Sequence, residues 1–234
     1  MAMEYLEPEW AATREAIEAV GCDVVYADRQ GVGNMSYAYN KAAAGIVGSY
    51  RYLWFVSNIL FEPWQAGVLL EGMEGWGAVH PAFSSDHRHL WPGDEIGIVE
   101  VPYVEWTAPM VDASLFAKIQ LDRRMPYWGM DLDWSYRARQ LGYRLGCSHD
   151  VVIGHEYIRN NPKPHQVTIK RRRMRRQTDQ PTHQQLIRKY GRDWRNVLGY
   201  QRSEQLKCQC KNAQFTRTVD ADFNPLCGRC GKAL

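Results

Sequence analysis

The most informative part of the chain is the stretch Tyr127-Trp-Gly-Met-Asp-Leu-Asp-Trp-Ser-Tyr-Arg-Ala-Arg-Gln-Leu-Gly-Tyr143. Within it, Trp134, Ala138 and Leu141 recur at the spacing of one helix face. Gly142 follows as a stop signal, because glycine commonly ends a helix. We therefore predict a short helix within this stretch.

Two carboxylates, Asp131 and Asp133, stand at the entrance of this helix. Unsatisfied backbone N–H groups at a helix N-terminus favour the ionised form of a nearby carboxylate, and such a carboxylate can take a proton from a hydroxyl nucleophile. Both residues are therefore candidate catalytic residues. They also suit a structural role, since Asp often caps a helix and Asp133 stands four residues before Arg137, the spacing of a helical ion pair.

The stretch from Gly129 to Leu145, with the segment Asp150-Val-Val-Ile-Gly-His155, resembles conserved parts of inverting, family 2 nucleotide-sugar glycosyltransferases with the GT-A fold. The similarity covers their acidic motif, helix, strand and histidine. It implies that Asp131 is the general base and that His155 helps to hold a divalent cation, Mn²⁺ or Mg²⁺, at the donor pyrophosphate. One departure is Met130, which replaces the first acid of the family motif.

The resemblance also implies a set of donor contacts. In the family, an Asp after the second strand contacts the base or ribose, a segment like 31–45 runs under the sugar nucleotide, and contacts near 103–112 frame the donor sugar. The corresponding candidates here are Asp28, Arg29, Asn34, Asn58 and Trp106. Taken alone, Asp28 and the glycines of the 31–45 segment fit turns equally well.

The metal-binding position of the family is altered in this chain. Where the family has Asp-x-Asp, the sequence reads Val56-Ser-Asn58. Asn58 keeps one carbonyl oxygen but lacks the charge that a hard divalent cation favours. Either Asn58 and His155 hold the cation weakly, or Lys and Arg side chains neutralise the phosphates, or the site has decayed.

Helices and strands alternate over the first part of the chain. Pro8 opens a helical pattern that Gly21 closes, and strand patterns follow at 23–28, 51–57 and 77–81. Such alternation predicts an α/β fold with a GT-A-like, mainly parallel sheet flanked by helices. Ligands of such sheets bind outside the carboxyl ends of the strands.

The length of 234 residues is enough for one main domain with a modest appendage. Its 45% hydrophobic and 24% charged residues are ordinary for a globular protein. We expect a GT-A-like domain over residues 1–165, a basic helical extension over 166–202 and a zinc ribbon over 203–234.

Basic residues are concentrated after residue 162, although the net charge of the chain is only +3. A helix predicted from Pro181 adds the basic range 188–195 to a dense basic block just before it. Such runs are typical of nucleic-acid contacts, although a solvated helix or a phosphate clamp for the donor fits them as well. The candidate nucleic-acid ligands of the block are Lys170, Arg171, Arg172, Arg173, Arg175 and Arg176.

The C-terminal part contains two close cysteine pairs, Cys208-Gln-Cys210 and Cys227-Gly-Arg-Cys230. Four thiolates in two pairs suit tetrahedral zinc. Because cysteine fills every position, no coordination site is open for catalysis, and we predict a structural zinc ion. The other two cysteines stand alone, which is consistent with a reducing compartment.

No apolar run approaches the length that spans a bilayer, and the N-terminus lacks the order of a signal peptide. We therefore expect a cytoplasmic protein without a membrane partner, in keeping with a virus-encoded enzyme that acts inside a host cell.

The basic segment and the zinc ribbon favour nucleic acid as the acceptor of a sugar from a UDP-linked donor. Ordinary DNA bases carry no free alcohol, so the acceptor would be a modified base such as a hydroxymethylpyrimidine. In this respect the chain resembles the DNA base glycosyltransferases of bacteriophages, which would have to flip such a base out of a duplex. Two alternatives are a transferase acting on a polysaccharide or other glycan, and a catalytically degenerate nucleic-acid-binding protein.

Overall fold

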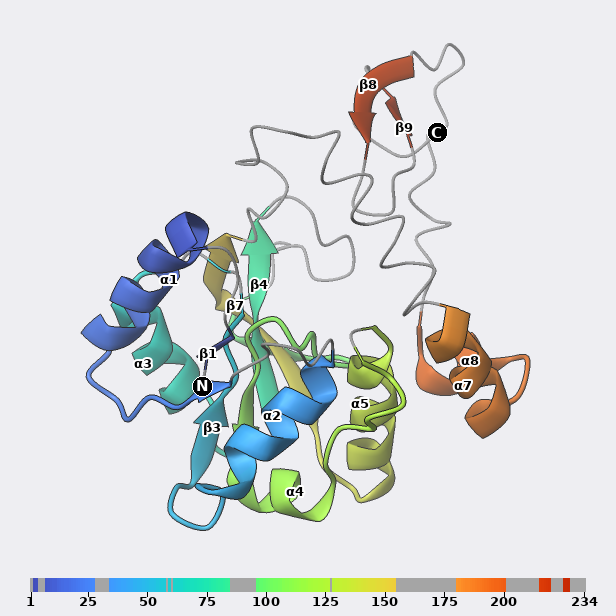
Figure 1. The fold of residues 1–234 in the computed structure, drawn as a ribbon, viewed down its shortest axis with the longest axis horizontal. Helices are drawn as coiled ribbons and strands as arrows, with labels where there is room; N and C mark the ends of the chain where they lie inside the picture. The colour runs from blue at the N-terminus through green and yellow to red at the C-terminus, as the bar shows by residue number, and fades with distance from the viewer. Residues whose placement is uncertain are drawn as a thin grey trace.

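The computed structural model describes residues 2–3, 7–27, 34–57, 59, 61–84, 96–126, 128–154, 180–200, 215–219 and 225–227. Over these residues the chain is an α/β protein with a five-stranded mixed sheet flanked by helices (Figure 1). The strands of this sheet are β3 (Tyr52–Trp54), β4 (Ala78–Ser84), β5 (Ile98–Glu100), β6 (Met110–Asp112) and β7 (Leu145–Gly154). None of the described helices is both long and apolar enough to cross a membrane.

The helices are α1 (Glu7–Ala19), α2 (Met35–Ala44), α3 (Pro63–Glu71), α4 (Ala113–Lys118), α5 (Met130–Gln140), α7 (Gln180–Tyr190) and α8 (Trp194–Leu198). Two short pairings lie apart from the main sheet. β1 (Ala2–Met3) pairs in parallel with β2 (Tyr26–Ala27), and β8 (Phe215–Val219) pairs antiparallel with β9 (Pro225–Cys227).

The five main strands lie in the order β3-β6-β4-β7-β5. Only β4 and β7 pair in parallel, whereas β3 with β6, β6 with β4, and β7 with β5 are antiparallel. The prediction of a mainly parallel sheet is therefore wrong for these strands. The physical reason is that β6 enters between β3 and β4 after the irregular segment 101–109, while a parallel neighbour needs a crossover connection.

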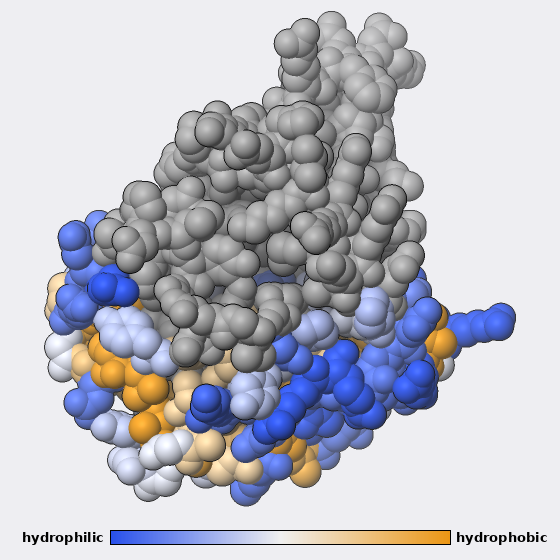
Figure 2. Space-filling view, viewed as in Figure 1, coloured by the Kyte–Doolittle hydropathy of each residue, from blue (hydrophilic) through white to orange (hydrophobic). Residues whose placement is uncertain are grey.

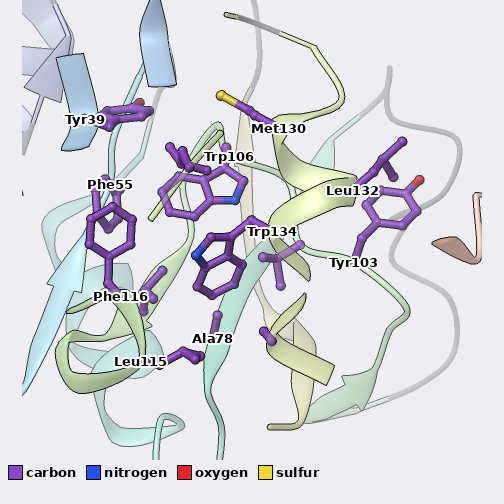
Figure 3. Packing of buried hydrophobic residues seen from close by; sticks show 14 of the residues in the cluster. Tyr39, Phe55, Ala78, Tyr103, Trp106, Leu115, Phe116, Met130, Leu132 and Trp134 are labelled. Carbon is purple, nitrogen blue, oxygen red and sulfur yellow. The ribbon is translucent and has the colours of Figure 1, made fainter. Parts of the chain in front are cut away.

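The sheet separates two apolar cores. Neighbouring residues of a strand point to opposite faces, so Ala78 belongs to the core with α2, α4 and α5, and Val79 belongs to the core with α1 and α3. Figure 1 shows these two groups of helices on either side of the strands. In the first core, Trp134 of α5 packs edge-on against Trp106 with ring centroids 5.2 Å apart (Figure 3).

Helix α5 confirms the helix predicted from the sequence. Trp134 and Ala138 are fully buried, as the apolar spacing predicted. Leu141 is instead 53% exposed, because the helix ends at Gln140 and the chain turns away at Gly142 (φ +82°). The buried face of α5 is therefore shorter than the sequence pattern suggested.

Helices α7 and α8 pack against α5, α7 at its start and α8 near its last turn. Leu186, Trp194 and Leu198 are fully buried and belong to the same core as α5. The sequence predicted one helix from Pro181 that includes the basic range 188–195, but the chain is divided at Gly191 (φ +80°) into two helices. Apolar residues of both helices still reach the core.

The backbone of α5 approaches α7 closely at Gly129, the N-cap of α5. It has φ +76°, and a Cβ atom there would lie 2.8 Å from Thr182 Cγ2 of α7. Gly142 is a matched control, because it has φ +82° and a Cβ atom there would meet nothing within 4 Å. Only the first glycine is needed for contact with α7.

We expect both Gly129→Ala and Gly142→Ala to lose roughly 1–2 kcal/mol of unfolding free energy, since alanine disfavours a left-handed backbone. Gly129→Ala should lose about 1 kcal/mol more, because its methyl group overpacks the contact with α7. Urea unfolding of the two variants measures the difference. Equal losses would contradict the tight packing of α7 on α5.

Candidate active site

Asp131 lies in the first turn of α5 and is half-buried. The N-cap residue, Gly129, has no side chain with which to satisfy the N–H groups of this turn. Asp131 Oδ1 accepts a hydrogen bond from the Leu132 backbone N–H at 2.9 Å. The carboxyl group is thus held at the helix N-terminus, as the sequence predicted.

A second carboxyl group, that of Glu105, lies near enough to Asp131 for its charge to act on the Asp131 carboxyl. Glu105 is half-buried and belongs to the segment 101–109, which precedes β6. Two contacts fix its neighbours on α5: the Val104 backbone N–H donates to Ser135 Oγ at 3.1 Å, and the Trp106 ring packs on Trp134. This part of the chain is therefore held against the first two turns of α5.

The same segment lies at the carboxyl end of β3. The Phe55 N–H donates to Pro109 O at 2.9 Å, and the Ser57 N–H donates to Thr107 O at 2.8 Å, which extends the pairing of β3 with β6. Because β3, β4 and β7 run in the same direction, residues 107–109 stand at the edge where ligands of α/β sheets gather, and Glu105 comes two residues before them.

Asp131 and Glu105 share an environment that favours their protonated forms. Burial raises the pKa of Glu105 to about 7. Burial and then the negative charge of Glu105 raise the pKa of Asp131 to about 7, although the backbone N–H groups around Gly129 and Leu132 oppose the shift. The two carboxyls thus titrate together near neutral pH, which suits proton transfer.

Tyr103 lies on the other side of the first turn of α5 from Trp134 (Figure 3). Burial, followed by the negative charges of Glu105 and Asp131, raises the pKa of its hydroxyl group. The ring also packs on Tyr200, with centroids 6.2 Å apart. Tyr103 therefore stays neutral and links the carboxyl pair to the end of α8.

Asp133 has a different environment, although it is only two residues from Asp131. It is fully buried, and its carboxylate accepts hydrogen bonds from Arg137 Nε at 2.9 Å and Tyr190 Oη at 2.6 Å, together with a bond from Lys189 Nζ. The ion pair to Arg137 that the sequence suggested is present. Asp133 thus joins α5 to α7.

Lys189 extends this network to the segment before α5. Its Nζ lies 3.1 Å from Asp122 Oδ2, so one ammonium group bridges Asp122 and Asp133. Partial burial tends to raise the pKa of Asp122, but hydrogen bonds from Arg124 and the nearby Lys189 outweigh it and hold the pKa well below its usual range. Both acids are therefore structural partners of one cation from α7.

Two donor-contact candidates have clear structural roles. Asn34 is the N-cap of α2: its Oδ1 accepts from the Tyr37 N–H at 2.9 Å, and its Nδ2 donates to Arg123 O at 2.7 Å. Trp106 is 2% exposed and packs among core aromatic rings (Figure 3). The burial of the Trp106 ring leaves little of its face open for stacking on a sugar, and its role at a donor stays a prediction.

Several other candidates lie outside the described residues: Asp28, Arg29, Asn58, His155, the basic residues 170–176, and Cys208, Cys210 and Cys230. Cys227 is the last residue of β9, the second strand of the β8–β9 pair. Within the described part of the chain, no three His, Cys, Asp or Glu side chains form a group suited to a metal ion.

No protein-family model matches this chain, and no curated protein is detectably similar to it.

Sequence reasoning missed Glu105 as the partner of Asp131, and Lys189 with Tyr190 as the partners of Asp133. Glu105 did carry a signal, since it stands between Val104 and Trp106 in an apolar run, where an acid is costly unless it is protonated or paired. No local pattern marked the other two residues as partners of α5.

Asp133→Asn should lose about 3 kcal/mol of unfolding free energy, because it removes the buried counter-charge of Lys189. Lys189→Met should also lower the unfolding free energy. The Asp133→Asn/Lys189→Met double variant should lose less unfolding free energy than the sum of the losses in the two single variants. Chemical denaturation of all four proteins gives the coupling energy. Additive losses, within about 0.5 kcal/mol, would show that the two residues do not interact.

The carboxyl pair should make stability depend on pH. Because the pKa of Glu105 is raised in the folded state, its contribution is fully present below the unfolded value near 4.5 and is lost as the pH rises through about 7. Glu105→Gln should therefore raise the melting temperature at about pH 8, by about 3 °C or more, and change it little at about pH 4.5. The exposed Glu71→Gln is the control. If Glu105→Gln lowered the melting temperature by the same amount at both pH values, this role of Glu105 would be refuted.

Proposed function

We propose that the protein is an inverting glycosyltransferase that moves a sugar from a nucleoside diphosphate, UDP in the first instance, to an acceptor hydroxyl group. The observation that carries the proposal is the carboxyl pair of Asp131 and Glu105 at the start of α5, with pKa values raised to about 7. A base with a pKa near the working pH combines a useful ionised fraction with a strong drive to accept a proton. The resemblance of 129–145 to the acidic motif of such enzymes gives Asp131 its proposed place in the reaction.

In the proposed reaction, ionised Asp131 accepts the proton of the acceptor hydroxyl as its oxygen attacks the anomeric carbon of the donor sugar. A new carbon–oxygen bond forms on one face while the bond to the diphosphate breaks on the other, which inverts the anomeric centre. The diphosphate leaves with the electron pair of the broken bond. Glu105 keeps the pKa of Asp131 high enough for the transfer.

Asp133 takes a positioning role in this proposal. Its carboxylate is fully buried and is bound to Arg137, Lys189 and Tyr190. A carboxylate with these partners is less able to reach a substrate hydroxyl than half-buried Asp131. The proposal therefore assigns the base to Asp131 alone.

The proposed acceptor is a hydroxymethylpyrimidine in DNA. Support comes from the basic block at 169–176 in the sequence and from Arg188 and Arg192, two exposed cations within residues 180–200. A glycan acceptor is the alternative within the same reaction class. We also propose that the four C-terminal cysteines hold a structural zinc ion, which stabilises the fold and takes no part in the reaction.

One observation favours a second candidate function, a degenerate nucleic-acid-binding protein. Asn34 and Trp106, two of the expected donor contacts, are occupied by capping and core packing. Such a protein would bind nucleic acid without turning over any donor. Release of diphosphate from a panel of nucleotide sugars, with and without Mn²⁺, separates the two candidates.

Asp131→Asn should lower transfer by about 10²–10⁴-fold, the usual contribution of a general base, and keep the fold. In the wild type the rate should rise with pH through an inflection near 7, the pKa of Asp131. In Glu105→Gln the inflection should move to lower pH, because a like charge that raised the pKa is gone. Near-normal turnover by Asp131→Asn would exclude it as the base and return Asp133 to that role.

Labelled sugar should appear on DNA that contains hydroxymethylated pyrimidines and not on unmodified DNA. A polysaccharide acceptor is tested in parallel. Label on the polysaccharide alone would overturn the DNA acceptor and leave the glycosyltransferase in place.

A further inference from the structure

Residues 180–200, which form α7 and α8, lie directly against the candidate site. Thr182 and Leu186 cover Gly129, two residues before Asp131. Farther along, the ring of Trp194 packs edge-on against Trp128 with centroids 5.8 Å apart. Tyr200 packs on Tyr103, which itself lies beside the carboxyl pair. Residues 180–200 therefore contact two neighbours of the carboxyl pair, the N-cap of α5 and the ring of Tyr103.

These helices also carry an excess of positive charge. Between residues 180 and 200, Arg188, Lys189, Arg192 and Arg195 stand against a single acid, Asp193. Lys189 is used by the ion pairs to Asp122 and Asp133, and Arg195 lies over the ring of Trp194, 4.6 Å from its centroid. This leaves Arg188 and Arg192 as cations without such a structural role in the described part of the chain.

Both of these arginines are exposed. Arg188 is in the last turn of α7, and Arg192 lies in the turn between α7 and α8. A third exposed arginine, Arg124, lies beside α7, since the amide oxygen of Gln185, oriented to accept, lies 3.2 Å from its Nε, but its guanidinium is paired with Asp122 at 2.8 Å. In Figure 2 the side of the molecule that carries α5, α7 and α8 is mainly hydrophilic, whereas apolar residues show toward the side of α1 and α3.

We propose that the segment 180–200 binds the phosphate backbone of a nucleic acid through Arg188 and Arg192 and so presents one of its bases to Asp131 and Glu105. This inference rests on the proposed function, whose acceptor it locates. One exposed arginine in α7 and another in the turn after it suit an extended polyanion, because separate phosphates along its backbone can pair with each of them. The pyrophosphate of a small donor would instead be held by side chains that close around it.

The test uses the full chain and a fluorescent DNA duplex that contains hydroxymethylcytosine, with binding followed by anisotropy at several salt concentrations and no donor present. Arg188→Gln/Arg192→Gln should bind about tenfold more weakly near physiological salt, and the slope of log K against log salt should fall by about two, one for each lost phosphate contact. Lys41→Gln/Arg51→Gln is the matched control, because it removes two exposed cations from α2 and the start of β3. The control should bind like the wild type.

Equal affinity and equal salt slope for the two double variants, with unchanged melting temperatures, would overturn the proposal. Competition by heparin but not by unlabelled DNA would also overturn it, in favour of a sulfated glycan. Arginine-dependent DNA binding without transfer from any donor would support the surface and reject the transferase. Transfer to DNA with an unchanged KM in Arg188→Gln/Arg192→Gln would support the transferase and overturn the proposed binding surface.

Discussion

The geometry of the site depends on the ion pairs and hydrogen bonds of one buried carboxylate, that of Asp133. It draws Arg137 of its own helix and Lys189 and Tyr190 of α7 into one network. Asp131 precedes it by two residues, so the two side chains point about 200° apart around the helix axis. Fixing Asp133 toward α7 therefore turns Asp131 away from that network, to where Glu105 lies. One acid stabilises the helix packing, and the other is left for chemistry.

The carboxyl pair itself opposes folding at neutral pH. Two partly buried acids with raised pKa values favour a protonated state that the unfolded chain does not share. Proteins tolerate such unfavourable groups chiefly where function needs them, and the surrounding structure must offset the cost. Here the packing of Trp106 on Trp134 and the bond from Val104 to Ser135 hold the Glu105 segment in place.

Features set by local chemistry were predictable from the sequence, and features set by distant contacts were not. Gly21 and Gly142 end α1 and α5 with φ of +74° and +82°, because the stop signal of a glycine is local. The position of β6 and the pairing of Glu105 with Asp131 depend on parts of the chain that meet only in the fold. Asn34 shows a further limit, since an Asn before a helix suits a ligand contact and a cap equally, and its side chain forms the cap.

The shared titration of Asp131 and Glu105 is tested most directly by infrared spectroscopy of protein labelled with ¹³C in its Asp and Glu carboxyl groups. The Asp131→Asn/Glu105→Gln double variant provides the difference spectrum. The raised pKa values predict a protonated carboxyl band in the wild type at about pH 6 that disappears by about pH 8 and is absent from the double variant. A wild-type spectrum in which both carboxylates are already ionised at about pH 6 would contradict this view of the site.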